Sequence, residues 1–95
     1  MHAVRFHHGL RVEFVQRPGS SPAAPVDPFA ATAVQTFTHL ALQVSDLDAA
    51  FTRLTGECAA VPVSSPAPGV TEGMRSAYIA DPEGNLVELI ETSHD

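Results

Sequence analysis

The sequence predicts an α+β fold, in which a β-hairpin precedes a βαβββ unit that holds most of the chain. Three observations support this prediction. Several short segments alternate apolar and polar residues, which is typical of half-buried strands. One segment, residues 45–56, repeats its apolar residues at helical spacing. A proline-rich stretch separates the hairpin from the βαβββ unit.

The N-terminal segment, residues 1–16, is predicted to be a hairpin that turns at Gly9. In its second half Leu10, Val12 and Phe14 alternate with Arg11 and Glu13, the pattern of a strand with one buried face. Residues 17–35 form a linker. They contain four prolines, and prolines this dense fix φ and remove backbone donors, so neither a helix nor a central strand fits.

Residues 36–95 are predicted to be one continuous unit. The first strand spans Thr36 to Val44, and its two faces carry His39, Ala41 and Gln43 on one side and Leu40, Leu42 and Val44 on the other. We expect Ser45 to cap the following helix, with Asp48 completing a capping box, and Gly56 to end it.

Three strands are predicted after the helix. The first covers residues 58–63, with Cys58 as a small core residue, and leads into a loop through Pro66, Pro68 and Gly69. A strand from Met74 to Ala80 and a strand from Leu86 to Glu91 follow. The sequence Asp-Pro-Glu-Gly at 81–84 joins these last two strands in a tight turn.

The chain also contains an internal repeat. Residues 3–16 align with residues 77–91 when one residue is omitted from the first turn, and this alignment places Gly9 on Gly84 and Glu13 on Glu88. The apolar pattern agrees throughout. The sequence therefore predicts that the N-terminal hairpin and the last hairpin are copies of one motif.

Composition excludes several classes of function. The 95 residues carry a formal net charge of -6 and contain no lysine, which argues against nucleic acid as a partner. No apolar run is long enough to span a membrane, and no signal-peptide pattern opens the chain, so a cytoplasmic protein is expected. The single Cys58 rules out an internal disulfide. A phosphate-binding loop and a nucleophile triad are also missing from the sequence.

Two segments together resemble a known family. The segment Phe-Thr-His-Leu-Ala-Leu-Gln-Val-Ser-Asp at 37–46 and the segment Asp-Pro-Glu-Gly-Asn-Leu-Val-Glu-Leu at 81–89 are similar to the glyoxalase/bleomycin resistance/extradiol dioxygenase group, the vicinal oxygen chelate superfamily. The resemblance implies that residues 36–95 are one βαβββ module of a cupped mixed sheet. It also implies that residues 1–16 are the end of a first module, whose opening strand, helix and second strand have no counterpart here.

The resemblance also implies a metal site. The ligands of metal-binding members correspond to His39 and Glu88, and Glu13 is the counterpart of Glu88 in the earlier hairpin. One imidazole and two carboxylates suit a divalent ion such as Zn²⁺, Mn²⁺, Fe²⁺, Co²⁺ or Ni²⁺. The alternation agrees, because each of the three residues lies on the strand face opposite its apolar neighbours. A surface histidine and solvated glutamates are the ordinary alternative. Tyr78 and Gln43 are candidates to line the same cup.

Three functions are compatible with these residues. The first is a metal-dependent lyase, isomerase or dioxygenase that binds a small substrate with vicinal oxygens, with Glu88 moving a proton. The second is a metal-free small-molecule binding protein of the antibiotic-resistance type, and the third is a non-catalytic truncated module. A chain this short buries only about 60–65% of its unfolded surface, so we expect a homodimer that completes the cup.

Overall fold

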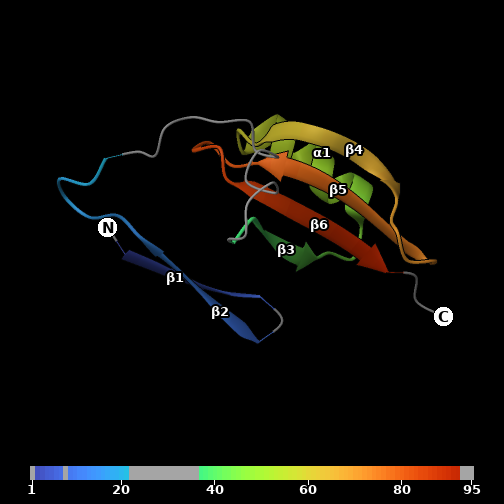
Figure 1. Cartoon of the computed structure of the whole chain (residues 1–95), viewed down its shortest axis with the longest axis horizontal. Helices are drawn as coiled ribbons and strands as arrows, with labels where there is room; N and C mark the ends of the chain where they lie inside the picture. Colours follow the sequence, from blue (N-terminus) through green and yellow to red (C-terminus); the bar gives the residue numbers. More distant parts are fainter. Residues whose placement is uncertain (1, 8, 22–36, 93–95) are drawn as a thin grey trace.

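The computed structural model describes residues 2–7, 9–21 and 37–92, which form a β-hairpin and a βαβββ unit (Figure 1). In the hairpin, β1 (His2–His7) pairs antiparallel with β2 (Leu10–Val15). The unit consists of β3 (His39–Gln43), α1 (Leu47–Glu57), β4 (Val61–Pro68), β5 (Met74–Ala80) and β6 (Leu86–Thr92). The predicted fold class and order of elements are confirmed. Residues 22–36, most of the predicted linker, lie outside the described residues.

The βαβββ unit forms a mixed four-stranded sheet in the order β3-β6-β5-β4. β3 runs parallel to β6, while β5 is antiparallel to both of its neighbours. A crossover through α1 is what allows the first strand of the unit to lie beside the last one in parallel. Within the described residues, no helix has the length and apolar character needed to cross a membrane.

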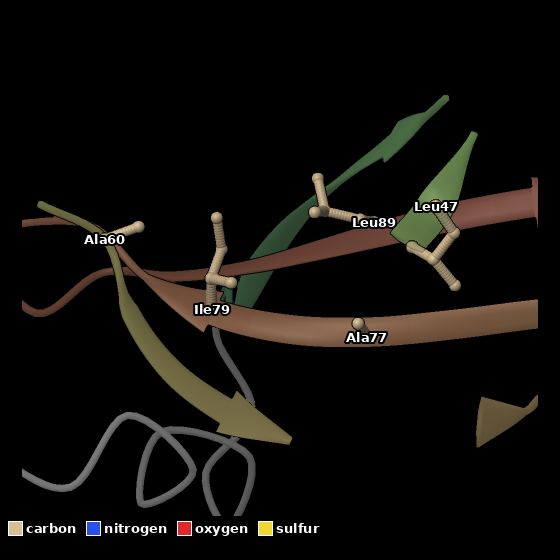
Figure 2. Packing of buried hydrophobic residues seen from close by; sticks show 5 residues of the cluster. All are labelled: Leu47, Ala60, Ala77, Ile79 and Leu89. Carbon is tan, nitrogen blue, oxygen red and sulfur yellow. The ribbon is translucent and has the colours of Figure 1, made fainter. Parts of the chain in front are cut away.

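The core lies between α1 and one face of this sheet. Leu47 of α1, Ala77 of β5 and Leu89 of β6 are almost completely buried, and Ile79 and Ala60 complete the cluster (Figure 2). Burial of a leucine side chain contributes roughly 1.5–3 kcal/mol to folding. Partly buried side chains of β3, the residue after it, α1 and β6 pack around the cluster: Leu42, Val44, Ala50, Phe51, Leu54 and Val87. The opposite side of the sheet, which α1 does not cover, is called the helix-free face below.

Helix α1 begins one residue later than predicted. Asp46, not Ser45, is the N-cap: it has extended backbone angles, and its Oδ1 accepts a hydrogen bond from the backbone N–H of Ala49 at 3.1 Å. Leu47 is buried and is the first residue of the helix. The N-cap is the residue directly before the first turn, so it is Asp46. Asp48 forms no capping box and instead accepts two hydrogen bonds from Arg75 of β5, at 3.0 and 3.1 Å. These bonds lower the pKa of Asp48.

The end of α1 also differs from the prediction. Gly56 lies inside the helix, which continues to Glu57, and Cys58 is the C-cap, with its backbone N–H donating to the carbonyl of Leu54. Ala59 then adopts a φ of 60°, the left-handed conformation that glycine usually provides. This turn brings Ala60 into the core and leaves Cys58 exposed, so the prediction that Cys58 is a core residue is wrong.

Strand β4 runs through residues that the sequence predicted to be a loop. It spans Val61–Pro68 and so includes Pro62, Pro66 and Pro68. Proline is tolerated here because β4 is an edge strand, where one side of the backbone has no partner strand in the described sheet. Its pairing with β5 shifts register twice, between Pro62 and Ser64 and between Ser64 and Ala67, which is the irregularity that prolines impose.

The two hairpins have the same pairing register, as the internal repeat predicts. Glu13 lies opposite Val4 in β1–β2, and Glu88 lies opposite Tyr78 in β5–β6. The alignment of the repeat places Val4 on Tyr78 and Glu13 on Glu88, so equivalent residues occupy equivalent positions. Gly9 and Gly84 both have positive φ, 80° and 89°, where a side chain would be strained.

Candidate functional site

The centre of the candidate site is a contact between His39 and Glu88 on the helix-free face. Nε2 of His39 lies 3.1 Å from Oε1 of Glu88. In the parallel pair β3–β6, Ala41 is directly opposite Glu88, so the imidazole reaches diagonally along the sheet to the carboxylate. The side chains are 27% and 15% exposed, respectively. They are thus partly desolvated and still accessible.

Two neighbours fix the orientation of this pair. Thr38 Oγ1 lies 2.8 Å from Nδ1 of His39, which leaves Nε2 directed at Glu88. Tyr78 of β5 stands edge-on to the imidazole, with ring centroids 5.5 Å apart. Burial of its phenol raises the pKa of Tyr78, and the negative charge of Glu88 and a hydrogen bond to that carboxylate raise it further. Tyr78 therefore stays protonated and donates to Glu88.

A second polar pair lies further along the same two strands. Nε2 of Gln43 donates to Oγ1 of Thr92 at 3.0 Å. Gln43 is opposite Ile90 in the register, so this contact is diagonal in the same way as the contact between His39 and Glu88. Each pair joins a residue of β3 to the residue of β6 two positions beyond its direct neighbour. The helix-free face thus carries two polar pairs of the same geometry.

Glu13 does not join His39 and Glu88 within the described residues. It is exposed on β2, in the separate two-stranded sheet. Among the residues that the structure describes, no three histidine, cysteine or acidic side chains gather closely enough to hold a metal ion. The structure thus assembles two of the three predicted ligands and places the third elsewhere.

Comparison with known proteins agrees with the fold. The sequence model of the Glyoxalase/Bleomycin resistance protein/Dioxygenase superfamily matches residues 1–89, which include both the hairpin and nearly all of the βαβββ unit. The chain belongs to this superfamily. No curated protein matches it in sequence.

Among solved structures, this superfamily member is similar to TioX from Micromonospora sp. ML1. The TM-score is 0.62 and the sequence identity is 26%, and the likeness covers 99% of this chain and 68% of TioX. The aligned part therefore includes the N-terminal hairpin as well as the βαβββ unit. Both segments belong to the shared fold.

The donor atoms of His39 and Glu88 fit two positions around a divalent ion. Ligand bonds of about 2.0–2.2 Å to imidazole nitrogen and carboxylate oxygen place neighbouring donor atoms roughly 3 Å apart at right angles and about 3.4 Å apart in a tetrahedral site. The observed separation is 3.1 Å, within this range. The contact of Thr38 with Nδ1 is the outer-shell support that metal-bound histidines usually have. Catalytic zinc sites use three protein ligands, so a further donor must come from outside this pair.

Sequence reasoning missed two threonines that bind polar side chains of this face: Thr38, which contacts His39, and Thr92, which contacts Gln43. Thr92 could have been found, because it follows Glu88 by four residues and so lies on the same face of β6. Thr38 could not have been found by alternation, since it immediately precedes His39 in the sequence and belongs to the opposite face. Thr38 orients His39 because its own hydroxyl is turned toward Nδ1 of the imidazole.

Proposed function

We propose that this chain binds a divalent metal ion through His39, Glu88 and Glu13, and that the metal site binds a small molecule with two neighbouring oxygens. One observation carries the proposal: His39 and Glu88 come from sequence positions 49 residues apart and meet at 3.1 Å on the helix-free face. Both are among the residues that the family resemblance marks as ligands. Zn²⁺, Mn²⁺, Fe²⁺, Co²⁺ and Ni²⁺ all accept this set of donors.

The chemistry of such a site is proton transfer next to an oxyanion. A bound divalent ion supplies Lewis acidity that stabilises negative charge on substrate oxygens. Glu88 is the proposed catalytic residue, since its carboxylate can accept a proton from the substrate and return it. Thr38 holds the imidazole in place, and Tyr78 holds the carboxylate by a hydrogen bond. This arrangement suits a lyase, isomerase or dioxygenase step.

We further propose that Glu13 reaches the site from a second copy of the chain. In one chain the hairpin forms its own sheet, and Glu13 lies outside the pair. Glu13 has the register position of Glu88, so a hairpin docked beside the helix-free face would present an equivalent carboxylate. Residues 1–16, 17–35 and 36–95 then act as docking hairpin, linker and module of a homodimer.

Elemental analysis of the purified, tag-free protein tests the proposal. We expect one divalent ion per chain in the parent protein, and at least a tenfold loss of affinity in Glu88→Gln and in Glu13→Gln. Glu57→Gln is the matched control, because Glu57 is at the exposed end of α1. Sedimentation of the same samples measures whether the chain is a dimer.

The outcomes separate the parts of the proposal. A parent protein that binds none of Zn²⁺, Mn²⁺, Fe²⁺ and Ni²⁺ overturns the metal site and favours a metal-free binding protein. Metal binding that Glu13→Gln leaves unchanged overturns the third ligand alone. A monomer that still binds metal overturns the dimer.

A further inference from the structure

The pair Gln43–Thr92 has no role in the proposed metal chemistry, yet it repeats the geometry of His39–Glu88. Both members lie four residues further along their strands, from 39 to 43 on β3 and from 88 to 92 on β6. At about 3.3 Å per residue, the two polar pairs are about 13 Å apart. This distance is the length of a small elongated molecule, not of a single chelating group.

The stretch between the two pairs is mostly small or apolar. Ala41, exposed on β3, carries only a methyl group, and half-buried Ile90 of β6 is the direct neighbour of Gln43. Ser76 of β5 is directly opposite Ile90. Ala41 and Ser76 therefore contribute only short side chains to the face between His39 and Gln43. A ligand body that lies there meets a methyl, a branched aliphatic chain and one hydroxyl.

The pair Gln43–Thr92 is uncharged and offers both hydrogen-bond donors and acceptors. Gln43 has an amide N–H and an amide oxygen, and Thr92 has a hydroxyl. Two charged side chains of the neighbouring strand positions, Glu91 and Arg75, belong to the other face of the sheet, where Glu91 accepts from the backbone N–H of Leu47 and Arg75 binds Asp48. Met74 is the residue of β5 opposite Thr92. The chemistry at this end therefore selects a neutral polar group.

We propose that Gln43 and Thr92 form a second recognition point for the ligand of this site. The inference rests on the proposed function, since it takes the chelating end of the ligand to lie at His39 and Glu88. The ligand class is an elongated molecule with vicinal oxygens at one end, an apolar body, and a neutral donor–acceptor group such as a carboxamide about 13 Å away. Gln43 and Thr92 determine specificity and take no part in the chemical step.

Hydroxamic acids provide a direct test, because their two neighbouring oxygens chelate divalent metals. The probes are acetohydroxamic acid, which has only the chelating end, and hydroxamates with an aliphatic tail that ends in either a methyl or a carboxamide. Three tail lengths are used. They place the terminal group at about 0.5, 1.0 and 1.5 times the 13 Å spacing from the chelating end. Calorimetry measures their binding to the metal-supplemented, full-length protein.

We expect the carboxamide to bind about 3- to 10-fold more tightly than the methyl at the matched length only, the gain typical of one net hydrogen bond. Gln43→Ala and Thr92→Val remove this gain and leave acetohydroxamic acid binding unchanged. Thr52→Val, on the exposed side of α1, is the matched control. Gln43→Glu shifts the preference toward a tail that ends in an ammonium group, which a merely structural hydrogen bond would not do.

The opposing outcomes are distinct. If acetohydroxamic acid binds but carboxamide and methyl tails bind equally at every length, the second recognition point is overturned and the metal site stands. If carboxamide tails gain affinity equally in Gln43→Ala, the gain comes from another residue and the assignment is overturned. If none of the hydroxamates binds the metal-supplemented protein, the proposed function fails and the ligand class fails with it.

Discussion

The hairpins β1–β2 and β5–β6 share a register and a glycine of positive φ, but they differ in what covers them (Figure 1). Leu89 of β6 is 1% exposed beneath α1, while Phe14, its equivalent on β2, is 57% exposed. The helix packs on β4, β5 and β6 of the four-stranded sheet. An isolated two-stranded hairpin is marginally stable in water. The same motif is thus a core element in one place and depends on further contacts in the other.

The largest expected effect comes from truncating the two equivalent apolar residues. Leu89→Ala should lower the free energy of unfolding by about 2–5 kcal/mol, because it opens a cavity in the core. Phe14→Ala should lower it by less than about 1 kcal/mol in a monomer, because the ring is already largely in water. Urea denaturation of both variants at low protein concentration measures the difference. Similar losses in the two variants would mean that the N-terminal hairpin is covered in solution.

A smaller effect is expected from weakening the helix that makes the two hairpins different. Asp46→Ala should cost about 0.5–2 kcal/mol, because the backbone N–H of Ala49 loses its acceptor. Ser45→Ala should cost little, since Ser45 is not the cap. Thermal unfolding followed by circular dichroism compares the two variants. A larger loss in Ser45→Ala would contradict the assignment of the cap.

The smallest expected effect is a dependence of stability on alkaline pH. It comes from the residue opposite the glutamate, which is Tyr78 opposite Glu88 but Val4 opposite Glu13. The pKa of Tyr78 is raised above its usual value of 10.0. The folded state therefore keeps the phenol proton where the unfolded chain releases it. Stability is fully present below about pH 10 and falls as the pH rises further toward the folded pKa.

Two measurements check this pH dependence. Tyr78 is the only tyrosine of the chain, so the near-ultraviolet absorbance of tyrosinate reports its ionisation directly. Tyr78→Phe should unfold in urea with a shallower dependence on alkaline pH than the parent protein. Ionisation of Tyr78 at or below its usual pKa would contradict the burial and the hydrogen bond to Glu88.

Local sequence patterns were sufficient for the order of elements and for the faces of the strands. Strict alternation placed His39 and Glu88 on one side of the sheet, and the structure brings them together there. The position of Glu13 did not follow from its strand, because alternation fixes a face within one sheet and carries no information about how two sheets meet. That Glu13 is a ligand remains a prediction.

The errors at the ends of α1 and in β4 have one physical origin. Ser45 and Gly56 are good capping residues by type, but the burial of Leu47 and Ala60 decides where the helix begins and ends. Tertiary packing then places Ala59 in a conformation that is costly for alanine. In the same way, the prolines of β4 are compatible with a strand only because that strand lies at an edge, which a local pattern does not reveal.

The prolines of β4 have a further consequence for how copies of this protein can associate. A sheet in which both edge strands are unpaired can pair with another chain at each edge and so grow into a fibre. Three prolines and two register shifts leave β4 a poor template for another strand. β3 is a regular strand at the opposite rim of the four-stranded sheet. Strand addition to this sheet would therefore end at two chains joined through β3, because only the β4 strands would remain at the outer edges.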